Sequence, residues 1–400
     1  SIKVSTNTVV SDIDRLIRRE KCKNLEGLLR LNSTRVIAKL KGIYSKYCSS
    51  RYGNSKQNQS SLCLFHSPIN KEGILYRTLK INADKNELFF TSGGTEADNW
   101  AFIGMTLFKG RKNGHIILTA FEHSAILETA KFLKNRGFDV TYIFPDRDGF
   151  IDAKDVTDAI REDTFLVSVM YVNNEVGTIQ DIKKICSFVK KKNPNIVFHT
   201  DAVQALSEIK IDVKDLNVDL LSVSGHKVHA PKGIGALYIK SGTEIENFIF
   251  GGSQERSRRA GTENVAGIVG FSKAIDILRD SREKNVSKRF ALREYFLKIL
   301  NENFSRFNIN GSLENRYSGN INISFPGVDK EMLIMSMDFR GICISGGSAC
   351  SSGAVEKSHV LDAMGIEEEL KNSAVRISFG ENNTFEEIDE FILALKEIID

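Results

Sequence analysis

Residues 221–227, Leu-Ser-Val-Ser-Gly-His-Lys, place a hydroxyl, an imidazole and an amine close together in the chain. Residues 219–223 predict a short buried strand, so Lys227 comes just after its end. Burying a charged amine costs hydration free energy, and a lysine at such a place therefore suggests a chemical role. A lysine amine with a lowered pKa forms a Schiff base with an aldehyde cofactor or a carbonyl substrate. The ordinary alternative is a surface lysine, because most lysines are exposed.

A second group of residues could bind an anion. Thr91-Ser92-Gly93-Gly94-Thr95-Glu96 follows an apolar run and opens a predicted helix. A glycine turn at a helix N-terminus exposes backbone N–H groups, and the helix dipole favours negative charge there, so residues 91–96 are a candidate phosphate site. The segment is neither a GxGxxG nor a Walker loop, so nucleotide binding is not indicated. An ordinary helix cap by Ser92 or Thr95 is the alternative.

Three further polar clusters come after predicted strands. Asp201 could keep a ring nitrogen protonated, as an electron-withdrawing pyridinium requires, and Gln204 could reach the same ligand. His123 could stack on an aromatic ring or move protons near neutral pH. Residues 173–177, Asn-Asn-Glu-Val-Gly, form a similar polar turn. An aspartate at a strand end is often only a helix cap, and a lone histidine there is usually structural.

Taken together, the clusters match a pyridoxal phosphate site, which needs a phosphate cradle, a ring-nitrogen partner, a stacking histidine and a Schiff-base lysine. Two features further along the chain add to it. Residues 345–353, Ser-Gly-Gly-Ser-Ala-Cys-Ser-Ser-Gly, predict a loop of small residues on which the Cys350 thiol could act as a nucleophile. The alternative is a linker with an incidental cysteine. Arg376, inside a predicted apolar strand, is typical of a carboxylate-binding arginine.

The elements that position these residues alternate between strands and helices. Apolar runs predict strands at 115–121, 165–172, 196–200, 219–223 and 235–239, with helices at 124–136, 153–161 and 181–191 between several of them. The alternation favours an α/β fold with a mostly parallel sheet, in which ligands bind at the carboxyl ends of strands. After about residue 280 a long helix (267–304), strands at 320–324 and 342–345, and helices at 357–371 and 384–398 predict a smaller α+β domain.

Composition limits the class of protein. The 400 residues carry a net charge of +4, with 41% hydrophobic and 26% charged residues, which is ordinary for a globular protein and lacks the dense basic patch of a nucleic-acid binder. No apolar run approaches the roughly 20 residues that span a bilayer. The six cysteines form no CxxC pair, so we expect neither a metal site nor a disulfide framework, and we expect a reducing, cytoplasmic location.

The sequence resembles the cysteine desulfurases of the NifS/IscS type, a branch of the class V aminotransferase group of fold-type I pyridoxal phosphate enzymes. The resemblance runs from about residue 84 to residue 400. The matching stretches are TSGGTEADN (91–99), EHSAIL (122–127), VNNEVGTIQDI (172–182), HTDAVQA (199–205), LSVSGHKVHAPKGIGALYI (221–239), GGSQERSRRAGTENVAGIVGF (251–271), SGGSACSSG (345–353) and VRISFG (375–380).

The resemblance implies a role for each matching residue. Lys227 would form the Schiff base with pyridoxal 5′-phosphate, and His123 would stack on the ring and assist proton transfer. Arg376 would hold the carboxylate of L-cysteine, and Cys350 would attack its sulfur to leave a persulfide and alanine. The remaining implied cofactor contacts are Asp201 to the ring nitrogen, Asn174 and Gln204 to the ring's 3-oxygen, Gly94, Thr95, Ser224, Gly225 and His226 around the phosphate, and Thr262 to the phosphate of the other subunit of a homodimer.

The N-terminal region departs from the family pattern. Leu31–Val36 is the best counterpart of the Asp-Asn-Ala-Ala-Thr-Thr-like segment, and it keeps Asn32, an implied substrate-side residue, without the preceding Asp. Residues 1–28 have no counterpart. The resemblance implies a large cofactor-binding domain at 37–280, and a small domain formed by 1–36 and 281–400 that carries the Cys350 loop.

The implied partners are L-cysteine and a sulfur acceptor, such as an iron–sulfur scaffold or a tRNA-thiolation enzyme, with no direct nucleic-acid or membrane contact. Two alternatives remain open at this point. One is a degenerate relative that binds the cofactor as a scaffold, and the other is a selenocysteine lyase or an aminotransferase.

Overall fold

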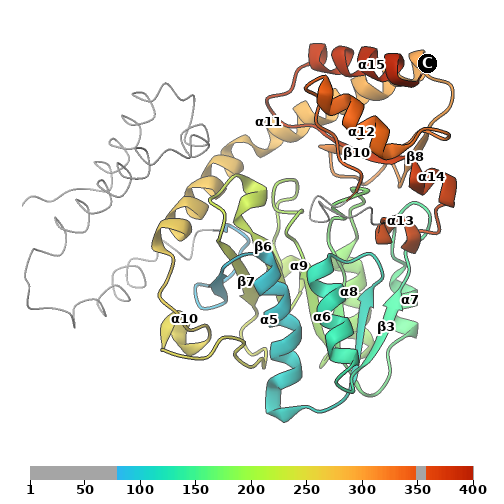
Figure 1. Ribbon diagram of the computed structural model, residues 1–400. Coiled ribbons are helices and arrows are strands. Elements are labelled where there is room, and N and C mark those ends of the chain that lie inside the picture. Colours follow the sequence, from blue (N-terminus) through green and yellow to red (C-terminus); the bar gives the residue numbers. More distant parts are fainter. Residues whose placement is uncertain (1–78, 348–356, 400) are drawn as a thin grey trace, which may run out of the picture. The chain divides into compact units, whose positions relative to one another are not determined.

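The computed structural model describes residues 79–347 and 357–399, which lie within one compact unit spanning residues 73–400 (Figure 1). Residues 1–78, 348–356 and 400 lie outside the described part, and with them the predicted site residues Asn32 and Cys350. Across the described ranges, no helix combines the length and the apolar content that crossing a bilayer requires.

The larger sheet has the strand order β1-β7-β6-β5-β4-β2-β3 in the described part of the chain. Neighbours from β6 to β3 run parallel, and β7 is antiparallel to both β6 and β1. Most of these strands are buried along their full length, which is why they read as continuous apolar runs. The strands are β1 (Leu88–Thr91), β2 (His115–Thr119), β3 (Asp139–Ile143), β4 (Thr164–Ser168), β5 (Val197–Asp201), β6 (Leu220–Ser224) and β7 (Gly235–Ile239).

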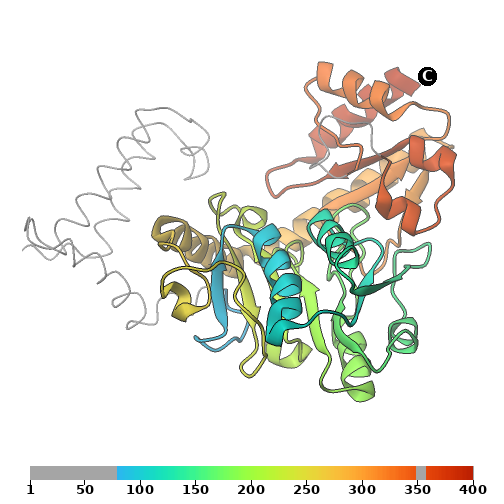
Figure 2. The ribbon, with the colours of Figure 1, turned by 60° about the horizontal axis from the view of Figure 1, so that its bottom comes forward.

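Helices cover both faces of this sheet (Figures 1 and 2). On one side α5 (Gly94–Leu107) packs against α6 (Ser124–Lys134), and on the other α8 (Ile182–Lys192) packs against α7 (Ala153–Asp158) and α9 (Val213–Leu216). In α8 the apolar residues that face the sheet recur at helical spacing, while lysines occupy the solvent side. The shorter helical segments are η2 (Phe108–Gly110), which continues α5, η3 (Gly225–Val228), which follows β6, and α10 (Gln254–Ser257), which comes after β7.

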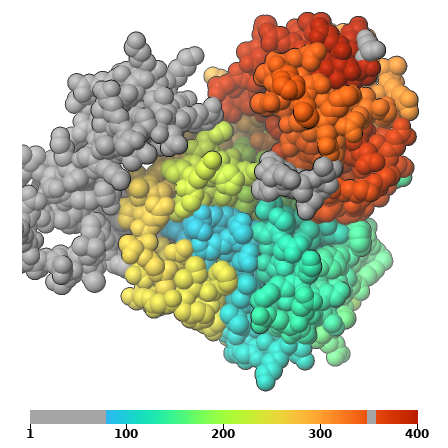
Figure 3. Space-filling model, in the orientation of Figure 1, coloured from blue at the N-terminus to red at the C-terminus, as the bar shows by residue number. Residues whose placement is uncertain are grey.

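A smaller antiparallel sheet has the order β10-β9-β8 and its own apolar core. Its strands are β8 (Asn308–Asn310), β9 (Asn320–Ser324) and β10 (Ala374–Ser378). The helices around it are α12 (Lys330–Phe339), α13 (His359–Ala363), α14 (Glu368–Asn372) and α15 (Phe385–Ile399). The long helix α11 (Val265–Asn303) contacts η3 of the large layer and α15 of the small one, so it joins the two. The space-filling view shows the orange and red C-terminal part directly against the teal part of the large layer (Figure 3).

The α/β class and the mostly parallel large sheet are confirmed, with differences in detail. The strand predicted at 342–345 is wrong, because these residues contribute only an isolated bridge from Ser345 to Arg376. The helix predicted at 357–371 is two short helices, interrupted near Gly365, whose φ is 67°. The predicted domain boundaries at 36/37 and 280/281 stay a prediction, and position 280 lies inside α11.

Candidate active site

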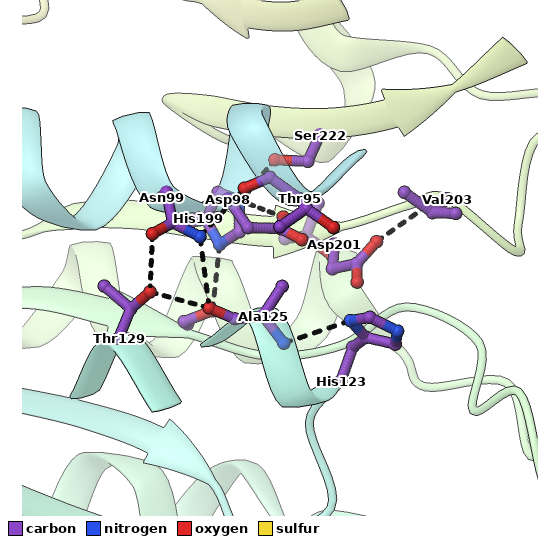
Figure 4. Close-up of polar contacts among 12 residues, drawn as sticks. Thr95, Asp98, Asn99, His123, Ala125, Thr129, His199, Asp201, Val203 and Ser222 are labelled. Carbon is purple, nitrogen blue, oxygen red and sulfur yellow. Dashed lines mark hydrogen bonds and ion pairs between the residues drawn. The ribbon is translucent and has the colours of Figure 1, made fainter. Parts of the chain in front are cut away.

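The predicted site residues gather where the parallel strands of the large sheet end. Asp201 is the last residue of β5 and Ser224 the last of β6, while His123 follows β2 by a short turn. Asp201 and His123 face the same space beyond the strand ends (Figure 4). This is the edge at which open α/β sheets bind ligands.

Lys227 lies in η3, directly after β6, and its side chain is exposed. The expectation of a lysine amine buried at a strand end is therefore wrong, because β6 ends at Ser224 and Lys227 lies in the short helix η3 that follows. The positive charge of Lys227 nevertheless lowers the pKa of His123, of Asp201 and of His226. One amine thus acts electrostatically on three predicted site residues that come from separate segments.

Asp201 is only 2% exposed, and its Oδ1 accepts a hydrogen bond from the backbone N–H of Val203 at 2.8 Å. Burial raises the pKa of its carboxyl, while the Val203 bond and the charge of Lys227 lower it. A buried carboxylate is stabilised by a cation beside it. The protonated ring nitrogen of a pyridine cofactor would be such a cation, so Asp201 fits the ring-nitrogen role.

His123 caps α6: its Nδ1 accepts a hydrogen bond from the backbone N–H of Ala125 at 3.1 Å. Burial lowers the pKa of the imidazole, and the charges of Lys227 and His359 lower it further. The neutral ring therefore carries its proton on Nε2, because the lone pair on Nδ1 is already engaged by the amide. His123 presents an N–H donor, rather than a free lone pair, at Nε2.

The predicted phosphate site at residues 91–96 is supported by the start of α5, which has no side-chain cap. Residue Gly93 precedes α5 and supplies no capping hydrogen bond, whereas α6, α7, α8, α11 and α12 each have one. The N–H groups at the start of α5 therefore remain available to an anion. A Cβ built on Gly93 would lie 3.9 Å from Ser224 Oγ, and that oxygen is 2.8 Å from His226 Nδ1. Helix end, hydroxyl and imidazole thus lie together, which fits a phosphate group.

Two glycines of the predicted set are required by close packing. A Cβ on Gly94 would lie 2.8 Å from Val203 Cγ2, and one on Gly225 would lie 2.8 Å from Ile234 Cγ2. Thr95 is the second residue of α5, and Gln204 lies in the turn after β5. The predicted contacts of these residues with the cofactor stay predictions.

Thr262 lies in the 255–264 segment, which borders the candidate phosphate segment at Thr91 and Ser92. It lines a cavity of about 190 Å³ together with residues of β1 and of the 255–264 segment. Its predicted contact with a phosphate held by another subunit stays a prediction.

Arg376 joins the small sheet to the site. Its Nη1 donates a hydrogen bond to the backbone carbonyl of Asn174 at 3.0 Å, and its backbone pairs with that of Ser345. Beside Asn174, the Asn173 side chain holds the turn by donating to the Phe121 carbonyl and accepting from two backbone N–H groups. The bond from Arg376 to Asn174 involves one guanidinium nitrogen, and the predicted contact of Arg376 with the carboxylate of the substrate stays a prediction.

The structure also reveals buried acids beneath the site that the sequence did not single out. Glu122 is fully buried, and burial together with the charge of Asp201 raises its pKa to about 8. Asp98 is buried 3.8 Å from His199 Nε2, and burial raises the pKa of its carboxyl well above the usual range. His199 in turn bonds Ser168 and Ser222. Asp98 lies within α5 and Glu122 directly before His123, so the only signal in the sequence was an acidic residue among apolar neighbours. Among the described residues, no group of His, Cys, Asp and Glu could hold a metal ion.

Comparisons with known proteins agree with this geometry. A model of the aminotransferase class-V family matches residues 41–391. The chain is 46% identical over 347 residues to a cysteine desulfurase IscS of Clostridium botulinum (strain Hall), covering 86% of this chain and 87% of that protein. It is 46% identical over 310 residues to a putative cysteine desulfurase IscS 1 of Bacillus subtilis (strain 168), covering 77% and 81%.

Two solved structures are also similar to this chain. A NifS-like protein superposes with a TM-score of 0.78 at 35% identity, covering 88% of this chain and 93% of that one. SspA, solved in complex with cysteine, superposes with a TM-score of 0.69 at 34% identity, covering 84% and 93%.

Proposed function

The chain belongs to the cysteine desulfurases of the class-V aminotransferase family, and we propose that it converts L-cysteine to L-alanine and transfers the sulfur to its own Cys350. The observation that carries the proposal is that Asp201 ends β5, Lys227 follows β6 and His123 follows β2, so that all three lie at the same edge of the sheet.

The family's cofactor, pyridoxal 5′-phosphate, supplies an aldehyde carbon for the amine and a pyridinium ring that withdraws electrons from the substrate. Four parts of the chain would hold it. Lys227 would bind the aldehyde, Asp201 would keep the ring nitrogen protonated, and His123 would lie against the ring. The start of α5 with Ser224 and His226 would bind the phosphate.

Substrate binding is assigned to Arg376 and the Asn174 turn. A guanidinium binds a carboxylate through two parallel hydrogen bonds, which would fix the orientation of L-cysteine. The Asn32 segment, outside the described residues, would complete this side of the site.

Sulfur transfer is assigned to Cys350. Its thiolate would attack the substrate sulfur, so that an S–S bond forms as the substrate C–S bond breaks. The β-carbon of the substrate takes up one proton and leaves as alanine, while the sulfur stays on Cys350 as a persulfide. Two thiols thus give one persulfide and one new C–H bond, with no external oxidant or reductant. A sulfur acceptor then removes the outer sulfur.

The test is to incubate the purified protein with L-cysteine and a thiol reductant, and to measure alanine and sulfide together. Equal amounts of both products are expected, and no alanine is expected from Lys227→Ala. A yellow, cofactor-loaded protein that yields neither product, with or without acceptor proteins, would instead support the scaffold alternative.

The proposal also includes the oligomeric state of the enzyme, its sulfur acceptors and its location. We infer a homodimer in which Thr262 of one subunit contacts the phosphate bound by the other, and a role in iron–sulfur cluster assembly or tRNA thiolation. The names of the IscS relatives support the sulfur-transfer role. A cytoplasmic location follows the expectation from the scattered cysteines, and cell fractionation tests it.

A further inference from the structure

The segment that carries Cys350 is flanked by two described stems, Ser345–Gly347 before it and Lys357–His359 after it. We propose that Glu175 is a positioning residue that holds both stems through a single carboxylate oxygen, Oε2. The catalytic consequence of this inference rests on the proposed function, whereas the structural part does not.

The stem after Cys350 is bonded directly to Glu175. The Ser358 hydroxyl donates to Glu175 Oε2 at 2.6 Å, a length typical of a charge-assisted bond to a carboxylate. The same hydroxyl oxygen caps α13 by accepting the backbone N–H of Leu361. The next residue, His359, lies with its Nε2 2.9 Å from the carbonyl oxygen of Glu122. This stem is therefore fixed at two points to the strand-end segments of the large sheet.

The stem before Cys350 passes close to the same oxygen. Gly347 has a φ of 141°, and a Cβ built on it would lie 3.4 Å from Glu175 Oε2. The Ser345 hydroxyl donates to the Gly347 carbonyl at 3.0 Å, and the backbone of Ser345 pairs with that of Arg376. The backbone of this stem thus runs between the substrate-side arginine and the Glu175 carboxylate.

Glu175 is itself held rigidly. It is only 1% exposed, its backbone N–H donates to Asn173 Oδ1 at 2.9 Å, and its carbonyl accepts from Asn320 Nδ2 at 3.3 Å. It also follows Asn174, whose carbonyl accepts from Arg376. A carboxylate removed from water is costly unless it is hydrogen-bonded, so the bond from Ser358 stabilises both the carboxylate and that stem. The turn at residues 173–175 therefore bonds Arg376 and the stem at Ser358, and it lies close to the stem at Gly347.

The first experiment compares backbone amide exchange in the full-length, cofactor-loaded protein and its variants. Glu175→Ala removes the carboxylate, and Glu175→Gln keeps the shape and one acceptor oxygen. Thr178→Val is the matched control, because Thr178 lies in the same turn but bonds the Asp148 carbonyl instead of either stem. In Glu175→Ala, exchange is expected to rise about tenfold or more in peptides covering 345–347 and 357–361. Glu175→Gln should show a smaller rise, and Thr178→Val none.

The second experiment follows catalysis in the same proteins. The rate of persulfide formation on Cys350, measured by mass spectrometry after short exposure to L-cysteine, should fall about 10- to 100-fold in Glu175→Ala. The KM for L-cysteine and the change in the cofactor's visible spectrum on adding it should stay near wild type, because Arg376 and Lys227 are untouched.

Each outcome decides a separate point. Unchanged exchange at either stem overturns the shared anchor. Raised exchange with an unchanged persulfide rate overturns the positioning role. If the wild type forms no persulfide at all, the proposed function is wrong, while amide exchange still decides whether Glu175 holds the stems. Should Glu175→Ala fail to fold, Glu175→Gln carries both measurements.

Discussion

Arg376 Nη1 and the Asn174 carbonyl oxygen lie 3.0 Å apart, in a hydrogen bond that connects the small sheet to the turn after β4. The two residues are 202 positions apart in the sequence, and each comes from a different layer of the fold. The bond orients the guanidinium from one side. The substrate-side role proposed for Arg376 therefore depends on both layers being assembled.

Replacing Arg376 with lysine keeps the charge but removes the planar pair of donors. We expect the KM for L-cysteine to rise about 10- to 100-fold, since hydrogen bonds to charged groups are worth about 1.5–3 kcal/mol. Steady-state kinetics measure this. Arg306→Lys is the control, because Arg306 is an exposed arginine paired only with Glu369 in the described part of the chain. An unchanged KM would remove Arg376 from the substrate site.

Asp201→Asn tests the ring-nitrogen assignment. Asparagine keeps an oxygen for the Val203 N–H, so the turn after β5 should survive. The charge opposite the ring nitrogen is lost, and turnover is expected to fall about 100-fold or more, as when one partner of a buried charged pair is removed. Turnover and bound cofactor are measured together. Full activity in a loaded Asp201→Asn protein would contradict the assignment.

His123 can be tested by separating its two tasks. Asparagine is a good helix cap, so His123→Asn should keep α6 stable while removing the imidazole, whereas His123→Ala should also lose about 1 kcal/mol of stability. Both variants should lose activity to a similar extent if the ring acts on the cofactor. Thermal unfolding measures the capping role, and turnover measures the role at the cofactor. If turnover falls only in the variant that loses stability, His123 has only a capping role.

The part of the site that could be predicted from sequence is the part encoded by short segments. Buried parallel strands are continuous apolar runs, so the residues that follow them, such as Asp201 and His123, are recognisable in the chain. β3 has no such signal, because it is an edge strand with mostly half-exposed residues. The hydrogen bond of Glu175 with Ser358 and its closeness to Gly347 depend on the tertiary fold, and no local pattern encodes them. The burial argument for Lys227 failed for a local reason, the end of β6 at Ser224.

Glu122 predicts a pH dependence of stability in the cofactor-free protein. Burial raises its pKa from 4.5 to about 8, so the folded state holds a proton that the unfolded state releases. Stability should therefore be fully present below about pH 4.5 and decline as the pH rises towards 8, by several kcal/mol in total. Glu122→Gln should decline less steeply than the wild type and gain on it between about pH 5 and about pH 9 in urea unfolding, while the raised pKa values of Asp98 and Asp201 account for the decline that remains. Glu128→Gln, at an exposed position of α6, should follow the wild type at every pH; a parallel decline in Glu122→Gln would exclude Glu122 as its source.

Lys227 is assigned to cofactor attachment and Cys350 to sulfur transfer, so replacing each residue should have a different effect. Lys227→Ala should abolish covalent attachment of the cofactor, seen as loss of its mass on the protein after borohydride reduction, and with it all alanine production. Cys350→Ala should keep the bound cofactor and its spectral response to L-cysteine, but release of sulfide should fall about 100-fold or more because the nucleophile is missing. Cys343→Ala is the matched control, since Cys343 is an exposed free thiol between α12 and the stem at Ser345 and should leave sulfide release unchanged. If instead Cys343→Ala loses activity while Cys350→Ala retains it, the sulfur passes through a different thiol from the one proposed.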